Sequence, residues 1–138
     1  MRLSRKSILV DAGPLVALGD PGDNAHHAAL AWARITPLPL VSTWAVITEA
    51  AHFLHRAKGP LFRQIQSGSL LIEELTAADM SRLLSIFEKY PQADFADASL
   101  VLIAERLGIT SIATLDARDF SIYRTASGTS FKNVFQAT

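Results

Sequence analysis

Four acidic residues stand where their carboxylates can act together. Asp11 directly follows the apolar run 8–10, and Asp116 directly follows a second, largely apolar segment. Both therefore come at the carboxyl ends of expected strands, the edge at which open parallel sheets bind ligands. Asp97 lies in the first turn of an expected helix, and Glu49 lies in another helix at the edge of its apolar arc. These positions suggest that four acids from distant parts of the chain share one site.

Carboxylates gathered in this way favour a divalent cation. Mg²⁺ and Mn²⁺ prefer carboxylate and water oxygens as ligands. Such an ion can orient a phosphate, polarise its P–O bonds and lower the pKa of a bound water. Asp11, Glu49, Asp97 and Asp116 are thus candidate metal ligands, and hydrolysis of a phosphodiester is the chemistry that they favour.

Each acid also has a purely structural interpretation. Asp94 and Asp97 are three residues apart and can form the acidic start of a helix. Asp116 fits an Asx turn, Asp11 fits a turn before Ala-Gly-Pro, and Glu49 fits an ordinary surface position. For Asp11 the functional interpretation is favoured, because a charge directly after a buried strand is costly unless it faces a cleft.

The composition excludes several classes of protein. The chain has no cysteine, so it has no disulfides, thiolate zinc sites or cysteine nucleophile. It contains neither a Gly-rich nucleotide-binding loop nor the G-x-S-x-G motif of serine hydrolases. No apolar run approaches the ~20 residues that span a bilayer, and the apolar run after the basic start is too short for a signal peptide. We therefore expect a cytoplasmic protein that does not bind membranes.

The charge balance limits how nucleic acid can be bound. Thirteen Lys and Arg residues match thirteen Asp and Glu residues, so the chain lacks the basic excess of many nucleic-acid-binding proteins. A nucleic-acid ligand would have to bind through local patches or through a metal. Candidate phosphate contacts near the acids are Arg56, Lys58, Arg63, Arg118 and Arg124.

The elements that must position these acids alternate between strand and helix. We expect strands at 7–11, 40–41, 70–72, 111–116 and 131–135, and helices at 14 onward, 23–35, 43–58, 76–90 and 94–107. Asp23-Asn24 is the expected cap of the second helix, and Gly59-Pro60 is expected to interrupt the third. This alternation predicts an α/β fold with a parallel sheet covered by helices on both faces.

The apolar spacing of two helices predicts the faces that they bury. In the third helix the expected apolar face is Trp44, Ile47, Ala51 and Leu54. In the fourth it is Met80, Leu83, Leu84 and Phe87, at positions i, i+3, i+4 and i+7.

Four sequence blocks together resemble a known family. They are Ile8–Leu15, Ile47–Ala51, Asp94–Leu100 and Ile112–Phe120. No single block is specific, but the ordered set covers essentially the whole chain. On these residues the chain resembles the PIN-domain ribonucleases, and within them the VapC-type toxins of bacterial and archaeal toxin–antitoxin pairs.

The resemblance implies a fold and an activity. The fold is a single PIN domain over 1–138, with three α/β/α layers and a central, mostly parallel sheet of four to five strands. The activity is that of a Mg²⁺- or Mn²⁺-dependent endoribonuclease, the toxin of a type II toxin–antitoxin system. The family's four acids carry over, in order, to the catalytic and metal-binding positions Asp11, Glu49, Asp97 and Asp116. At the last of these, family members often have either Asn or Asp.

The resemblance also implies partners and further site residues. An RNA substrate, a cognate antitoxin and a second copy in a homodimer are the expected partners. Asp94 can join the metal shell or only cap its helix, while Thr43, Thr114 and Asp119 lie where they can orient ligands. The sequence leaves open the RNA that is cut, the identity of the antitoxin and the number of metal ions.

Three other functions stay open at this level. The first is a non-catalytic PIN-like module that binds RNA or protein. The second is a phosphatase with an acid at the end of its first strand, which Gly13 disfavours because haloacid-dehalogenase-like enzymes place a second Asp there. The third is a DNA-directed flap-type nuclease, although such nucleases are usually longer and carry more acids.

Overall fold

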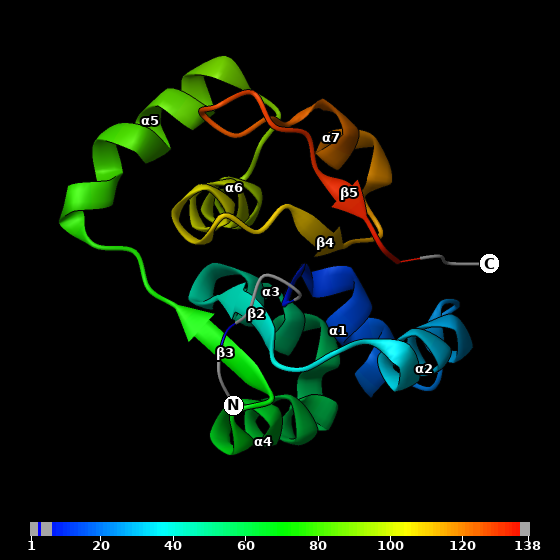
Figure 1. Ribbon diagram of the computed structural model, residues 1–138. Coiled ribbons are helices and arrows are strands. Elements are labelled where there is room, and N and C mark those ends of the chain that lie inside the picture. Colours follow the sequence, from blue (N-terminus) through cyan, green and yellow to red (C-terminus); the bar gives the residue numbers. More distant parts are fainter. Residues whose placement is uncertain (1–2, 4–6, 136–138) are drawn as a thin grey trace.

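Five parallel strands form the centre of the molecule. The computed structural model describes residues 3 and 7–135 (Figure 1). In chain order the strands are β1 (Ile8–Val10), β2 (Leu40–Thr43), β3 (Leu70–Glu73), β4 (Ser111–Ala113) and β5 (Lys132–Asn133). Their order in the sheet is β3-β2-β1-β4-β5, and every neighbouring pair is parallel. The expected α/β class is confirmed, with a sheet in which all the strands are parallel.

Helices connect the strands and flank the sheet. They are α1 (Ala12–Gly19), α2 (His26–Ile35), α3 (Trp44–Leu54), α4 (Gly59–Ser67), α5 (Met80–Lys89), α6 (Phe95–Leu107) and α7 (Ala117–Ile122), with short 3₁₀ helices η1 (His55–Lys58) and η2 (Ala77–Asp79). In Figure 1, α7 lies beside β5 and α4 lies beside β3. None of the helices in the part of the chain that the structure describes is long and apolar enough to cross a membrane.

The central strand and one central helix carry much of the core. All three residues of β1 are buried, as are the nine consecutive residues 96–104 of α6. A helix that is apolar almost all round belongs in the interior, where it packs on several neighbours at once. Asp97 is one of those nine residues, so its carboxylate extends from a rigid, buried element.

The expected apolar face of α3 is only partly correct. The structure buries Val46, Ile47, Ala50 and Leu54, while Trp44 is 47% exposed. Trp44 is the first residue of the helix, directly after the cap Thr43. Positions 46, 50 and 54 are spaced by four residues and therefore lie on one face of the helix.

The expected apolar face of α5 was too wide. Leu83 and Ile86 are buried, but Leu84 is 65% exposed and Met80 also faces solvent. Phe87 is half-buried against the core. The helix lies on the surface against α6, so a narrow stripe is enough to pack it.

The interpretation of Gly59-Pro60 as an interruption was wrong. Helix α3 ends at Leu54, followed by His55 with φ 51°, and Gly59-Pro60 opens the separate helix α4. Proline is well tolerated in the first helical turn, where its missing N–H has no partner to lose.

Two helix starts also differ from the sequence prediction. The carboxylate of Asp23 accepts a hydrogen bond from the N–H of Ala25, and α2 begins only at His26, so Asp23 closes a turn before the helix instead of capping it. The short helix α7 was not predicted. Its six residues are too few to show an apolar periodicity, although Phe120 anchors it in the core.

Candidate active site

Three of the acids cap helices that begin at the carboxyl edge of the sheet. Asp11 caps α1 through an Oδ1 that accepts from the next N–H at 2.8 Å, and Asp94 caps α6 through an Oδ1 that accepts from the N–H of Asp97 at 2.8 Å. Asp116 caps α7 in the same way, at 3.3 Å from the N–H of Asp119. The structural interpretation of Asp94 and Asp116 is therefore correct as far as it goes. Each cap uses one carboxylate oxygen, and the second oxygen of Asp11 accepts from the hydroxyl of Thr114.

The predicted acids meet in one open pocket. A cavity of about 320 Å³ is lined by Asp11, Ala12, Gly13, Glu49, Asp94, Asp97, Leu115 and Asp116. All four sequence-predicted site residues are among them, together with the capping residue Asp94. Parallel strands bring their carboxyl ends to one edge, which is why residues more than a hundred positions apart converge. The assignment of catalysis and metal binding to these residues stays a prediction.

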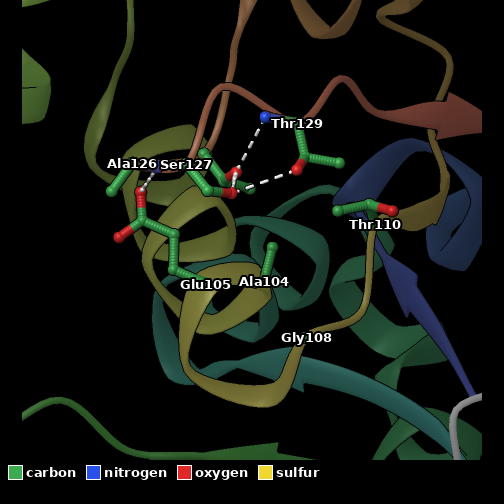
Figure 2. Close-up of a pocket in the computed structure, with 8 residues that line it drawn as sticks. Ala104, Glu105, Gly108, Thr110, Ala126, Ser127 and Thr129 are labelled. Atoms are coloured by element: carbon green, nitrogen blue, oxygen red, sulfur yellow. Dashed lines mark hydrogen bonds between the residues drawn. The ribbon is translucent and has the colours of Figure 1, made fainter.

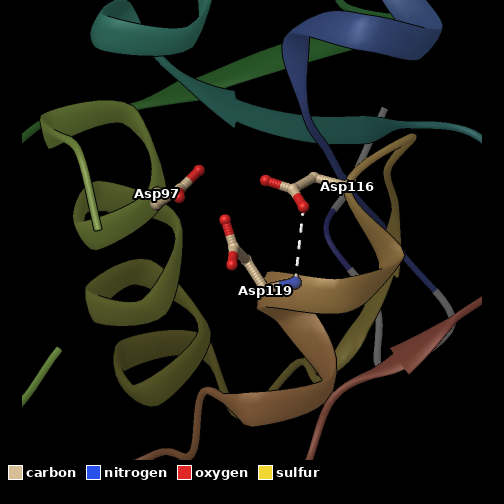
Figure 3. Close-up of side chains that lie close together, drawn as sticks. All are labelled: Asp97, Asp116 and Asp119. Atoms are coloured by element: carbon tan, nitrogen blue, oxygen red, sulfur yellow. Dashed lines mark hydrogen bonds between the residues drawn. The ribbon is translucent and has the colours of Figure 1, made fainter. Parts of the chain in front are cut away.

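A tighter group of acids lies beside this pocket. One carboxylate oxygen from each of Asp97, Asp116 and Asp119 lies within 4.8 Å of the others (Figure 3). Asp97 extends from α6, whereas Asp116 and Asp119 belong to the start of α7. The sequence analysis ranked Asp119 below the four main acids, because the helix that aims it was not foreseen.

Burial and mutual repulsion raise the pKa of three carboxyls of the pocket, those of Asp11, Glu49 and Asp97. Burial raises the pKa of Asp97 to about 7, although a hydrogen bond from Tyr123 opposes the shift. Burial also raises the pKa of Asp11, and it raises the pKa of Glu49 together with the nearby charges of Asp11 and Asp94. For Asp119 the main cause of a raised pKa is a hydrogen bond with the carboxyl of Asp116.

This donor set fits a hard divalent cation. Only oxygen ligands are offered, and a cation would relieve the repulsion and desolvation that raise the pKa of Asp11, Glu49 and Asp97. The cluster is of the kind that holds a metal ion in PIN-domain nucleases. The oxygens of Asp97, Asp116 and Asp119 lie close enough to share an ion, and Asp11 and Glu49 line the adjacent pocket.

Thr114 ties two of the acids together. Its hydroxyl donates to Oδ2 of Asp11 at 2.8 Å and accepts from the backbone N–H of Asp116 at 2.9 Å. Thr114 is buried, so this hydroxyl fixes the spacing between the ends of β1 and β4. Thr43, the other hydroxyl singled out in the sequence, instead caps α3 and hydrogen-bonds to Ser99 at 2.7 Å.

Sequence analysis missed a tyrosine in contact with the site. The hydroxyl of Tyr123 donates to Oδ2 of Asp97 at 2.8 Å, and the ring is fully buried. It packs edge-on against Tyr90 and Phe120. Nothing in the sequence pattern signals this pairing, because Tyr123 follows a helix that is too short to predict.

The fold and the pocket agree with the family comparison. The PIN domain model matches residues 8–126 of this chain. The chain therefore belongs to the PIN domain family, as its ordered acidic motifs predicted.

Two similar proteins are VapC ribonucleases or toxins by name. Ribonuclease VapC26 of Mycobacterium tuberculosis (strain ATCC 25618 / H37Rv) is 26% identical over 131 residues, which cover 90% of this chain and 97% of the relative. The crystal structure of Mycobacterium tuberculosis VapC20, described as a sarcin–ricin loop cleaving toxin, shares the fold with a TM-score of 0.72 and 21% identity. That match covers 81% of this chain and 92% of that one. This chain is thus distantly homologous to VapC ribonuclease toxins.

Proposed function

We propose that this protein is a Mg²⁺- or Mn²⁺-dependent endoribonuclease and the toxin of a type II toxin–antitoxin system. The observation that carries the proposal is the convergence of Asp11, Glu49, Asp97 and Asp116 on one pocket of a PIN-domain chain. The distant homology to VapC ribonucleases supports RNA as the substrate.

The roles of the acids follow from their positions. Asp97, Asp116 and Asp119 have oxygens close enough to share one ion, and Asp11 faces the same space. A bound Mg²⁺ or Mn²⁺ would stabilise negative charge on the scissile phosphate and lower the pKa of a bound water. Glu49 is half-buried at the pocket wall and has a raised pKa, which suits a group that orients the attacking water and accepts its proton.

Hydrolysis by water has a definite chemical outcome. The water oxygen forms a new bond to phosphorus, one P–O ester bond breaks, and the departing ribose oxygen takes up a proton. The ribose 2′-hydroxyl takes no part, so the products carry linear phosphates and no 2′,3′-cyclic phosphate.

The partners follow from the same family relationship. We propose that a second copy and a cognate antitoxin bind this chain. We also propose that residues 1–138 form a single domain, which acts on RNA in the cytoplasm. Large exposed side chains offer surfaces for such contacts: Trp44, Phe53, Phe62 and Phe95 are each more than 40% exposed. Trp32, which the sequence also suggested for partner contacts, is instead buried and packs on Phe135.

The direct test is cleavage of a total RNA pool by the purified chain, followed by analysis of the product ends. We expect cutting with Mn²⁺ or Mg²⁺, no cutting with chelator, and linear terminal phosphates. Cyclic phosphate ends, or cutting that persists in chelator, would contradict the mechanism. RNA binding without any cutting in either metal would support the non-catalytic binding module instead.

A further inference from the structure

A side chain of the last strand binds the backbone of Thr114, the residue whose hydroxyl bonds to Asp11. Asn133 ends β5, and its Oδ1 accepts from the backbone N–H of Thr114 at 3.2 Å. Its Nδ2 donates to the backbone carbonyl of Thr114 at 3.1 Å. A second hydrogen bond to Oδ1, from the N–H of Phe135 at 3.1 Å, holds the amide in this orientation.

These bonds extend the sheet beyond the end of its main-chain pairing. The β4–β5 register pairs Ile112 with Asn133, and the N–H of Val134 donates to the carbonyl of Ile112 at 2.8 Å. At Thr114 the side-chain amide of Asn133 replaces a strand backbone, since an amide offers one donor and one acceptor group. The backbone of Thr114 is therefore fixed at both its N–H and its carbonyl.

Thr114, whose backbone is held in this way, also bonds to two of the acidic residues. The hydroxyl of Thr114 bonds to Oδ2 of Asp11 and to the N–H of Asp116. Thr114 thus connects Asn133, bound at its backbone, to the carboxylate of Asp11 and the backbone N–H of Asp116, both bound at its hydroxyl. Groups that orient metal ligands in this manner commonly affect metal affinity although they do not touch the ion.

The segment that carries Asn133 lies outside the matched PIN domain, which ends at residue 126. It is anchored by its own contacts before it reaches the sheet (Figure 2). Glu105 of α6 accepts from the N–H of Ala126 at 2.9 Å, and the hydroxyl of Thr125 accepts from the N–H of Thr129 at 3.1 Å. The hydroxyl of Ser127 also bonds to the hydroxyls of Thr125 and Thr129. These three residues line a pocket, and their hydrogen bonds hold the turn in place.

We propose that Asn133 is a positioning residue of the acid site and acts through Thr114 to set the spacing of Asp11 and Asp116. The proposal rests on the proposed function for its consequence in metal binding. It assigns to the C-terminal strand, beyond the matched family segment, a part in shaping the pocket.

A double-mutant cycle in Mn²⁺ affinity tests the route through Thr114. The variants are Asn133→Ala, Thr114→Val and the double substitution, with Mn²⁺ binding followed by electron paramagnetic resonance in the absence of RNA. Each single substitution is expected to weaken binding roughly 10-fold, and the double variant is expected to bind no more weakly than the weaker single variant. Full additivity, or unchanged affinity in Asn133→Ala, would overturn the proposal.

Two further variants control for general disturbance of the segment and for misfolding. Ser130→Ala changes an exposed side chain in the same segment and should leave Mn²⁺ affinity unchanged. If Asn133→Ala does not fold, Asn133→Leu takes its place in the cycle, because it nearly keeps the shape of Asn and removes its donor and acceptor without adding a charge. A loss of affinity in Ser130→Ala as large as that in Asn133→Ala would mean that any disturbance of the segment has the same effect, and would overturn the specific role of Asn133.

A metal-free readout separates this proposal from the proposed function. The backbone N–H of Asp116 bonds to the hydroxyl of Thr114, so Asn133→Ala should reduce the protection of that amide from hydrogen exchange, measured by NMR. Unchanged protection would overturn the positioning role. If the wild-type chain binds no Mn²⁺ at all while this protection is lost in the variant, the proposed function fails and the positioning role of Asn133 stands.

Discussion

The hydroxyl of Tyr123 donates a 2.8 Å hydrogen bond to Oδ2 of Asp97, and both side chains are buried. This bond favours the ionised carboxylate and so opposes the effect of burial, which raises the pKa of Asp97. Burial also raises the pKa of Tyr123 itself, so the phenol stays protonated and remains the donor. This buried pair therefore influences the ionisation of a candidate metal ligand.

Replacing Tyr123 with Phe should weaken metal binding most near neutral pH. Without the hydroxyl, the pKa of Asp97 rises further above about 7, and protons then compete more strongly with the ion. Isothermal titration with Mn²⁺ at about pH 7 and about pH 9 checks this, since a deprotonated carboxylate removes the competition. The affinities of variant and wild type should converge at the higher pH. An equal loss at both values would mean that the hydroxyl acts on geometry alone.

The metal-free protein should become less stable as the pH rises. Because the pKa of Asp97 is about 7 in the folded protein against an ordinary value of 3.8, the folded state holds more protons than the unfolded state between these values. The free energy of unfolding therefore falls as the pH rises through this window and levels off above it. The raised pKa values of Asp11 and Glu49 act in the same direction.

Asp97→Asn removes the largest part of that pH dependence. Above pH 7 the metal-free variant should be more stable than the wild type by about 1–2 kcal/mol, a value reduced for solvent at the open mouth of the pocket. The difference should shrink toward pH 4. Urea unfolding with chelator at several pH values measures this difference in stability. A variant that is less stable than the wild type at every pH would contradict the claim that burial destabilises the ionised carboxylate of Asp97.

The capping role of Asp94 can be separated from its charge. Its Oδ1 accepts from the N–H of Asp97 at the start of α6, and Asn caps helices about as well as Asp. Asp94→Asn should therefore leave the free energy of unfolding nearly unchanged, whereas Asp94→Ala should lower it by about 1 kcal/mol. Chemical unfolding of the two variants side by side is the measurement. Equal losses in both would show that the charge, and not the cap, stabilises the helix.

Gly13 lets the start of α1 approach Leu115 on the pocket wall. A Cβ at Gly13 would lie 2.9–3.0 Å from Cβ, Cγ and Cδ1 of Leu115. The side chain of Leu115, the residue before Asp116, would therefore have to move. Gly13→Ala should cost about 1 kcal/mol of stability, the low end for overpacking because Leu115 is partly exposed, and it should also weaken Mn²⁺ binding. Gly22→Ala, whose nearest neighbour would be a carboxylate oxygen at 3.3 Å, is the matched control. Identical thermal unfolding and Mn²⁺ affinity in the two variants would contradict this account of the pocket wall.

Much of the fold was predictable because its signals are local. Buried runs ending in Asp11 and Asp116 indicate strands of a parallel sheet, and that topology alone brings their ends to one edge. Asp94 at a helix start is likewise readable from sequence, because a cap needs only the next few residues.

What the sequence did not predict depends on long-range packing. Helix α7 is held by Phe120 in the core and not by its own pattern, so the place of Asp119 in the cluster was ranked too low. The Tyr123–Asp97 bond joins residues 26 positions apart, and the link from Asn133 to Thr114 depends on an edge strand of two residues. Such contacts exist only once the sheet has assembled.

The most direct test of the central claim compares three proteins on one total RNA pool: the wild-type chain, Asp11→Asn and Asp97→Asn, each shown to be folded. With Mn²⁺ present, the wild type should cut the RNA, and both variants should lose that cutting, because each removes a carboxylate from the pocket. Cutting that survives in both folded variants would contradict the claim that this pocket is the active site.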